Sequence, residues 1–212
     1  QAVYDAATLT GATSFRTIRP YRDLPPDPRP WNMASIDDVL ATHACYSAAD
    51  LETSGEDYGP TRGWSISDGR VAAFTDSLPV LELRRLWGGR RLYLHNAKHD
   101  LPRFLINHWD LNSWEDTMLM SYNLRFPLVS LAEVGYQLTG IRKEAYLALL
   151  KRVGVKTQGK GATRDFASAL QKDRPAAEKY AAEDALVTAR IAPLLEGLLA
   201  SQPMTASHYR EI

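Results

Sequence analysis

Two carboxylates stand two residues apart, at Asp50 and Glu52, in a stretch whose pattern predicts a β-strand. Side chains two apart in a strand leave the same face of the sheet, so both carboxylates can converge on one cation. Hard divalent ions such as Mg²⁺ choose carboxylate oxygens, and a pair of such ions can stabilise both oxygens of a phosphoryl displacement. The alternative for an isolated Asp-x-Glu is an exposed strand end that enters the turn at residues 53–55.

A third carboxylate, Asp100, lies within the first turns of a helix that is predicted from about residue 97 to residue 109. Asn96 precedes this helix and is well suited to cap it. An acid at this position can merely compensate the helix macrodipole. It also lies near the carboxyl end of the preceding strand, where ligands of open α/β sheets usually bind, so Asp100 is a candidate site residue.

A fourth carboxylate, Asp184, follows Tyr180 by one helical turn at the start of the long final helix. The face that carries both residues continues through apolar residues such as Val187 and Ile191, so Asp184 is expected to point towards the core. A carboxylate on an apolar face is costly unless it is paired or bound to a metal ion. The neighbouring Glu183 falls on another face and is expected to be solvated.

The predicted elements that position these residues begin as strands with interleaved helices and then become mostly helical. The Ser35–Asp38 spacing predicts a helix start, and the Asp68-Gly69 pair predicts a tight hairpin turn. Strands are predicted at residues 44–52, 61–67, 70–75 and 91–95, and helices at residues 35–42, 78–87, 97–109, 116–124, 130–138, 144–152, 165–172 and 175–200. This order predicts an α/β or α+β domain around one mixed sheet flanked by helices.

The chain is predicted to be one domain at residues 35–200, with an extended proline-rich arm or linker at residues 1–34 and a tail at residues 201–212. Its 212 residues, 45% of them apolar, are enough to bury a full core. The run of prolines from Pro25 to Pro30 cannot hold a helix or a strand ladder. The start without methionine suggests either a trimmed chain or a piece of a longer polypeptide, which leaves room for a neighbouring domain.

The composition predicts a soluble protein with no membrane partner. No apolar run approaches the roughly 18 residues that span a bilayer, and the first residues lack the order of a signal peptide. The single cysteine, Cys45, excludes an internal disulfide framework and fits a reducing cytoplasm. With no targeting segment visible, a cytoplasmic or nucleoid-associated location is expected.

The distribution of charge matters more than its sum. A formal net charge of zero argues against a nucleic-acid partner, because phosphate binding usually leaves a basic signature. Cations nevertheless gather in two stretches, at residues 84–103 and 142–164, for which solvated faces are the alternative. The candidate nucleic-acid-binding residues are Asn96, Lys156, Lys160 and Arg164.

Three segments, in order, resemble the motifs of the DEDD-type 3′→5′ exonucleases of the tyrosine subtype. They are Asp50-Leu51-Glu52-Thr53, residues 95–100 and residues 180–188. Residues 116–119 and 130–133 resemble intervening segments of that family. Residues 158–166 are similar to the stretch before the third motif in the proofreading exonuclease domain of family A DNA polymerases. Any single motif is weakly specific, whereas three in order over residues 44–195 are quite specific.

The resemblance implies a ribonuclease-H-like fold and a site for two ions of Mg²⁺ or Mn²⁺. Asp50, Glu52 and Asp184 would hold one ion, and Asp50 with Asp100 would serve the second. Tyr180 would orient the attacking water as a neutral hydrogen-bond partner, and a nucleoside monophosphate would leave the 3′ end. The chain departs from the family at residue 99, where His99 replaces the usual Phe or Tyr without removing a ligand.

The form of the third motif implies a substrate. It resembles family A proofreading domains more than the RNA-trimming branch, which favours a single-stranded DNA 3′ end and a role in DNA replication and repair. The chain contains no polymerase palm or fingers, so it would be either a stand-alone exonuclease or an excised exonuclease domain with a polymerase as its neighbouring domain or partner. The alternatives are an RNA 3′-end processing exonuclease and a catalytically silent nucleic-acid-binding or scaffolding domain of the same fold.

Overall fold

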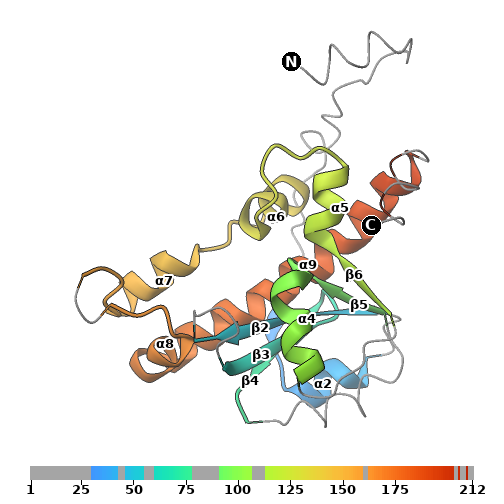
Figure 1. The fold of residues 1–212 in the computed structure, drawn as a ribbon. Coiled ribbons are helices and arrows are strands. Elements are labelled where there is room, and N and C mark those ends of the chain that lie inside the picture. The colour runs from blue at the N-terminus through green and yellow to red at the C-terminus, as the bar shows by residue number, and fades with distance from the viewer. Residues whose placement is uncertain are drawn as a thin grey trace.

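A six-stranded mixed sheet in the order β1-β4-β3-β2-β5-β6 forms the centre of the computed structural model (Figure 1). The structure describes residues 30–42, 46–54, 60–77, 91–106, 113–159 and 162–202, together with residues 205 and 209. The β1–β4, β2–β5 and β5–β6 pairs are parallel, whereas β2–β3 and β3–β4 are antiparallel, which confirms the predicted mixed sheet. The strands are β1 (Asn32–Met33), β2 (Tyr46–Thr53), β3 (Thr61–Ser67), β4 (Val71–Thr75), β5 (Arg91–Leu94) and β6 (Trp114–Asp116).

Helices cover both faces of this sheet (Figure 1). The helices α2 and α4 share an apolar core with one face, and α9 shares cores with the other face together with α5 and α6. Each helix matches a predicted one to within a few residues at its ends. The helices are α2 (Ile36–Ala41), α4 (Ala97–Ile106), α5 (Thr117–Asn123), α6 (Leu131–Thr139), α7 (Tyr146–Arg152), α8 (Phe166–Lys172) and α9 (Arg174–Ala200). In the described ranges, none of them is long and apolar enough to cross a membrane.

The strand β2 has small residues at its centre, where helices pack against both of its faces. Ala48 is buried in the core under α9, and Ala49 is buried in the core under α2 and α4. Because side chains alternate along a strand, Asp50 and Glu52 share the face of Ala48, which is the α9 side of the sheet. The period-two pattern therefore decides which helix the two acids face.

The β3–β4 hairpin turns at Asp68-Gly69, as predicted. Asp68 Oδ1 accepts hydrogen bonds from the backbone N–H groups of Arg70 and Val71, and Gly69 has φ 85°. Glycine adopts this left-handed conformation without a steric penalty. The guanidinium of Arg190, a buried residue of α9, donates a hydrogen bond to the Gly69 carbonyl at 2.9 Å, so the turn is tied to α9.

The long helix α9 packs against β2, β3, β4 and β5 and so fixes its side chains relative to the sheet. It begins after Asp173, whose side chain accepts the N–H of Ala176, and Pro175 lies in its first turn, where its missing N–H costs nothing. The helix α6 approaches α9 closely at Gly135, where an added Cβ would lie 2.5 Å from Val187 Cγ1. The positions along α9 are therefore held from two sides.

The sequence pattern does not predict two of the strands. The strand β1 pairs in parallel with β4 within the range assigned to the arm, and β6 has only three residues, too few to show a period-two pattern. Several sequence predictions fall outside the described residues. These are residues 1–29 of the arm, the helix at residues 78–87, the end of the helix at residues 107–109, Cys45 and most of the tail.

Candidate metal centre and active site

Three of the four candidate carboxylates meet on the α9 side of the sheet. Asp50 and Glu52 leave β2, Asp184 leaves α9, and carboxylate oxygens of all three lie within 4.8 Å of one another. Direct packing of α9 on β2 brings them together. Glu52 and Asp184 are buried and Asp50 is partly buried, so their charges are screened little by solvent.

Burial and repulsion disfavour the charged forms of the two acids on β2. Burial, followed by the charge of Asp100, raises the pKa of Asp50 to about 7. Burial, followed by the charge of Asp50, raises the pKa of Glu52 well above its ordinary value. Glu52 Oε1 is buried and accepts no hydrogen bond within the described part of the chain. An oxygen-lined group of this kind fits a hard divalent ion, whose charge would lower both pKa values again.

Asp100 approaches the same region from the first turn of α4. It is 1% exposed, and its charge is the second cause of the raised pKa of Asp50. Its Oδ1 lies 3.0 Å from His99 Nδ1, whereas Oδ2 accepts no hydrogen bond in the described ranges. Burial raises the pKa of Asp100, and His99 opposes this rise. The residue at which the sequence departs from the DEDD pattern is thus a direct partner of a candidate ligand.

Asp116, at the junction of β6 and α5, holds the start of α4. Its carboxylate accepts the backbone N–H groups of Asn96 at 3.1 Å, of Ala97 at 2.9 Å and of Met118 at 2.8 Å. One buried side chain therefore takes up N–H groups at two helix starts. Asn96 itself has φ 73°, a left-handed conformation that asparagine tolerates better than most residues.

Tyr180 lies one turn before Asp184 and is 8% exposed. Its ring packs against the ring of Tyr146, with 5.7 Å between the two centroids. Burial, followed by the charge of Glu52, raises the pKa of Tyr180, so its hydroxyl stays neutral near pH 7. A neutral phenol can donate a hydrogen bond to a reacting group but is a poor general base.

Removing the Tyr180 hydroxyl should slow the reaction without removing a metal ligand. We expect Tyr180→Phe to bind metal ions as wild type does and to lower the single-turnover rate by about 10- to 100-fold, because one positioned hydrogen-bonding group is lost. Calorimetric metal titrations and single-turnover kinetics on the same preparation measure the two effects separately. Equal rates for Tyr180→Phe and wild type would remove Tyr180 from the site.

Lys143 lies inside the carboxylate group, although the sequence assigns it only to a basic stretch. Its ammonium contacts Asp184 Oδ1 and lies 3.8 Å from the centroid of the Tyr180 ring, and its side chain is 5% exposed. Burial lowers the pKa of Lys143 to about 8, and the charges of Asp50 and Glu52 oppose this fall. Lys143 stands between two predicted helices, where no periodicity indicates the direction of a side chain.

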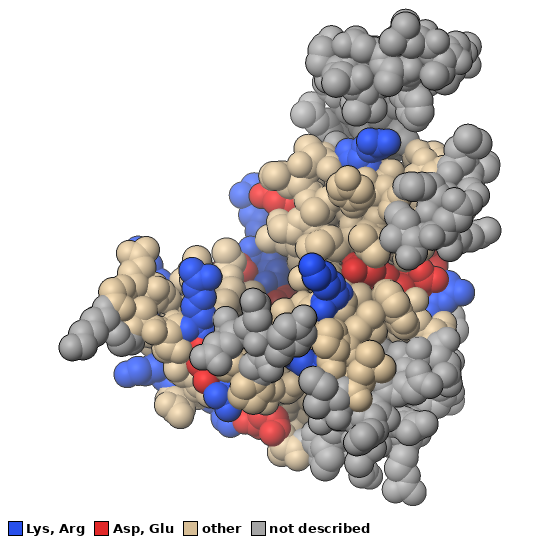
Figure 2. All heavy atoms as spheres, in the orientation of Figure 1, with Lys and Arg blue, Asp and Glu red and all other residues tan. Residues whose placement is uncertain are grey.

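A cavity of about 610 Å³ opens beside Tyr180, between α7 and the first turns of α9. Figure 2 shows basic side chains around a hollow on this side of the molecule, with acidic atoms deep within it. Glu183 lines the cavity and is partly buried, and burial raises its pKa. The expectation that Glu183 is solvated holds only in part, because its side chain is partly buried near Lys143.

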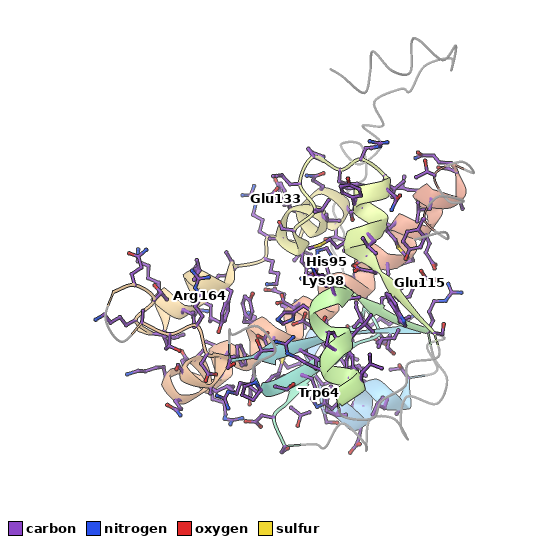
Figure 3. The ribbon with its side chains drawn as sticks, in the orientation of Figure 1. Trp64, His95, Lys98, Glu115, Glu133 and Arg164 are labelled. Carbon is purple, nitrogen blue, oxygen red and sulfur yellow. The ribbon has the colours of Figure 1, made fainter. Side chains whose placement is uncertain are left out.

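The candidate nucleic-acid-binding residues remain predictions. Lys156 and Arg164 are exposed after α7, and Lys160 lies outside the described residues. Figure 3 shows Arg164 on the α7–α8 side, apart from His95 and Lys98, which lie where β5 passes into α4. A nucleic-acid strand that contacted both the α7–α8 side and the β5–α4 junction would cross the hollow of Figure 2.

His95 is a buried neutral histidine at the end of β5. Its Nε2 lies 2.9 Å from the Val129 carbonyl, which can only accept, so Nε2 carries the proton. Its Nδ1 lies 2.9 Å from Thr117 Oγ1, whose hydroxyl donates a hydrogen bond to the Leu94 carbonyl at 2.9 Å. Burial lowers the pKa of His95 to about 4.

The lowered pKa of His95 should make folding sensitive to acid. The unfolded chain binds a proton with a pKa of about 6.5, so the contribution of His95 is complete above that pH and is lost as the pH falls towards about 4. Denaturant unfolding of wild type and His95→Gln at pH 4.5, 5.5 and 7 measures this contribution. The stability difference between the two proteins should shrink as the pH falls, and a constant difference would contradict the assignment.

The topology and the position of the acids define the class of fold. A mixed sheet of this order, covered on both faces, with acids on its central strand β2 and on the helix packed against it, is ribonuclease-H-like. Solved structures over most of the chain confirm this fold. Neither a protein-family model nor a curated protein matches the sequence.

Three proteins are among the solved structures that resemble this chain. The catalytic core of RRP6 from Trypanosoma brucei matches with a TM-score of 0.60 and 17% identity over 98% of this chain and 59% of that one. Escherichia coli RNase D matches with a TM-score of 0.55 and 19% identity over 85% of this chain and 49% of that one. Brucella melitensis NrnC matches with a TM-score of 0.57 and 17% identity over 85% of this chain and 86% of that one. This chain therefore spans about half to three fifths of the RRP6 and RNase D chains.

Proposed function

We propose that this chain is a metal-dependent 3′→5′ exonuclease that hydrolyses single-stranded nucleic-acid ends. The observation that carries the proposal is the convergence of Asp50, Glu52 and Asp184, with Asp100 close to Asp50. Two similarities of fold support it: Escherichia coli RNase D is an exoribonuclease, and NrnC has been solved with bound Mg²⁺. The presence of all four carboxylates and of Tyr180 argues against a silent domain.

The residues divide into ligands and positioning groups. Asp50, Glu52 and Asp184 would hold one divalent ion, and Asp50 with Asp100 would serve the second. Bound divalent ions supply a hydroxide-like nucleophile at neutral pH and stabilise charge on the phosphoryl group. The protein holds the carboxylates in a buried position, and the neutral Tyr180 hydroxyl would orient the attacking group.

The cavity beside Tyr180 provides a place for the end of a strand. Arg142 and Lys179 line it and offer positive charge to phosphates, which a protein of zero net charge can provide only locally. Arg142 also lies over the Tyr136 ring, 4.7 Å from its centroid, so its guanidinium is held in place. We infer that the last phosphodiesters of the substrate enter between these cations and the carboxylates.

Two polymers, DNA and RNA, are candidate substrates. The third sequence motif favours DNA, through its resemblance to family A proofreading domains. RNA is the second candidate, because the fold is shared with an exoribonuclease. Discrimination depends on contacts with the 2′-hydroxyl, which is the chemical difference between the two substrates at a given site.

End-labelled oligonucleotides test the proposal. Matched single-stranded DNA and RNA of one sequence, labelled at the 5′ end, should shorten stepwise from the 3′ end in Mg²⁺ and remain intact in EDTA. The ratio of kcat/KM for the two polymers then identifies the preferred substrate. Loss of the 5′ label before any shortening, or full activity in EDTA, would refute the exonuclease.

A further inference from the structure

Lys143 is the buried cation of the carboxylate group. Its ammonium contacts Asp184 Oδ1 and interacts electrostatically with Asp50 and Glu52. The same ammonium donates a hydrogen bond to the Glu144 carbonyl at 3.4 Å.

A divalent ion and the Lys143 ammonium would occupy overlapping positions next to Asp184. Oxygens of Asp50, Glu52 and Asp184 lie within 4.8 Å of one another, and Mg²⁺ contacts its oxygen ligands at about 2.1 Å. An ion bound by all three would lie against the atom that the ammonium now contacts. Two cations this close repel strongly in a poorly solvated site. Occupation of Asp184 by one therefore disfavours occupation by the other.

The segment that carries Lys143 is anchored by the side chains of Arg142 and Glu144, which bind Tyr136 and Arg152, and not by its backbone N–H groups. It connects α6 to α7 without regular structure, and within the described chain no hydrogen bond involves the backbone N–H of Arg142, Lys143 or Glu144. Glu144 and Glu183 line the neighbouring cavity and both interact electrostatically with Lys143. The ammonium thus has acidic partners on the cavity side.

We propose that Lys143 is an internal counter-ion that exchanges with a divalent metal ion at Asp184 and moves into the cavity beside Tyr180 when the metal ion binds. This inference rests on the proposed metal centre. It assigns the Lys143 ammonium two positions, one at Asp184 and one that faces the end of the nucleic-acid strand in the cavity. The metal affinity of the site is then set by competition within the protein as well as by its ligands.

Removal of the ammonium should tighten metal binding. Lys143→Met keeps the long apolar stem and deletes the charge. If the ammonium is at Asp184 for about nine tenths of the time, the apparent dissociation constant of a metal ion is raised about tenfold. We therefore expect Lys143→Met to bind Mn²⁺ about tenfold more tightly than wild type in calorimetric titrations. In EDTA the same variant should melt at a lower temperature, because the acids lose their counter-ion.

Lys179→Met is the matched control, because Lys179 is an exposed lysine that lines the same cavity. Its Mn²⁺ affinity should stay within about twofold of wild type, since exposed charges are screened. Equal tightening in both variants would overturn the exchange, as would unchanged or weaker binding in Lys143→Met. A wild-type protein that binds no Mn²⁺ would refute the metal centre itself, which distinguishes the two failures.

A second measurement uses wild type and so remains decisive if Lys143→Met does not fold. An amine-acylating reagent is applied in EDTA and in saturating Mn²⁺, and modified peptides are quantified by mass spectrometry. Lys143 should react slowly in EDTA and several times faster with Mn²⁺, whereas Lys179 should react equally in both. A Lys143 that stays protected in saturating Mn²⁺ would overturn the exchange.

Discussion

Alanine in place of Asp50 or Asp100 should lower the rate of 3′-end hydrolysis by at least about a thousandfold, because each change deletes a ligand of an ion that stabilises transition-state charge. Both side chains are largely removed from solvent, so water cannot readily replace the lost oxygen in the same geometry. Single-turnover rates on a 5′-labelled strand in saturating Mg²⁺ measure the effect without interference from product release.

Glu133→Ala is the control for loss of an acid elsewhere. Glu133 is exposed on α6, away from the β5–α4 junction in Figure 3, and its replacement should leave the rate unchanged. Near-wild-type rates for both Asp50→Ala and Asp100→Ala would contradict the site. An equally slow Glu133→Ala would show that loss of any acid impairs the protein.

The second large effect concerns stability in EDTA, where Asp50→Asn should melt at a higher temperature than wild type above pH 7. Folding raises the pKa of Asp50 from its ordinary 3.8 to about 7. A group whose pKa is raised contributes stability that is complete below its unfolded pKa and is lost as the pH rises through its folded pKa. Metal-free wild type should therefore lose stability between about pH 4 and pH 7, and Asp50→Asn should lose less.

Mg²⁺ should reverse this order. Wild type should gain about 2.7 kcal/mol at a free metal concentration 100 times the dissociation constant, because only the folded state offers the site. Asp50→Asn should gain much less. Thermal melts of both proteins at pH 5 and pH 8, with EDTA or Mg²⁺, give all four comparisons. Identical Mg²⁺-induced shifts in the two proteins would contradict a shared ligand role.

The sequence predicts those site residues whose side-chain direction follows from the periodicity of a strand or a helix. Asp50 and Glu52 fall on one face because strand side chains alternate, and Tyr180 and Asp184 fall on one side of α9 because they are one turn apart. Both patterns continue into buried residues, such as Ala48 and Val187, which fix the direction of the acids. The helices are predicted well for the same reason, since each carries several apolar residues at helical spacing.

The parts that the sequence does not predict depend on contacts between elements. Asp116 is recognisable as a residue at the start of α5, but its hydrogen bonds to the start of α4 arise only when β6 lies beside β5. The strand β6 itself is too short to produce a pattern. Lys143 belongs to an irregular segment, so nothing in its local sequence distinguishes a lysine aimed at buried carboxylates from a solvated one.

The most direct test of the metal centre is the anomalous diffraction of Mn²⁺ in crystals of this chain. A peak should appear at coordination distance from Asp50, Glu52 and Asp184, and the same data should show Lys143 Nζ withdrawn from Asp184. Crystals of Asp50→Asn under the same conditions should lose the peak. A Mn²⁺ peak elsewhere in wild type, with no density among these carboxylates at saturating metal, would contradict the account.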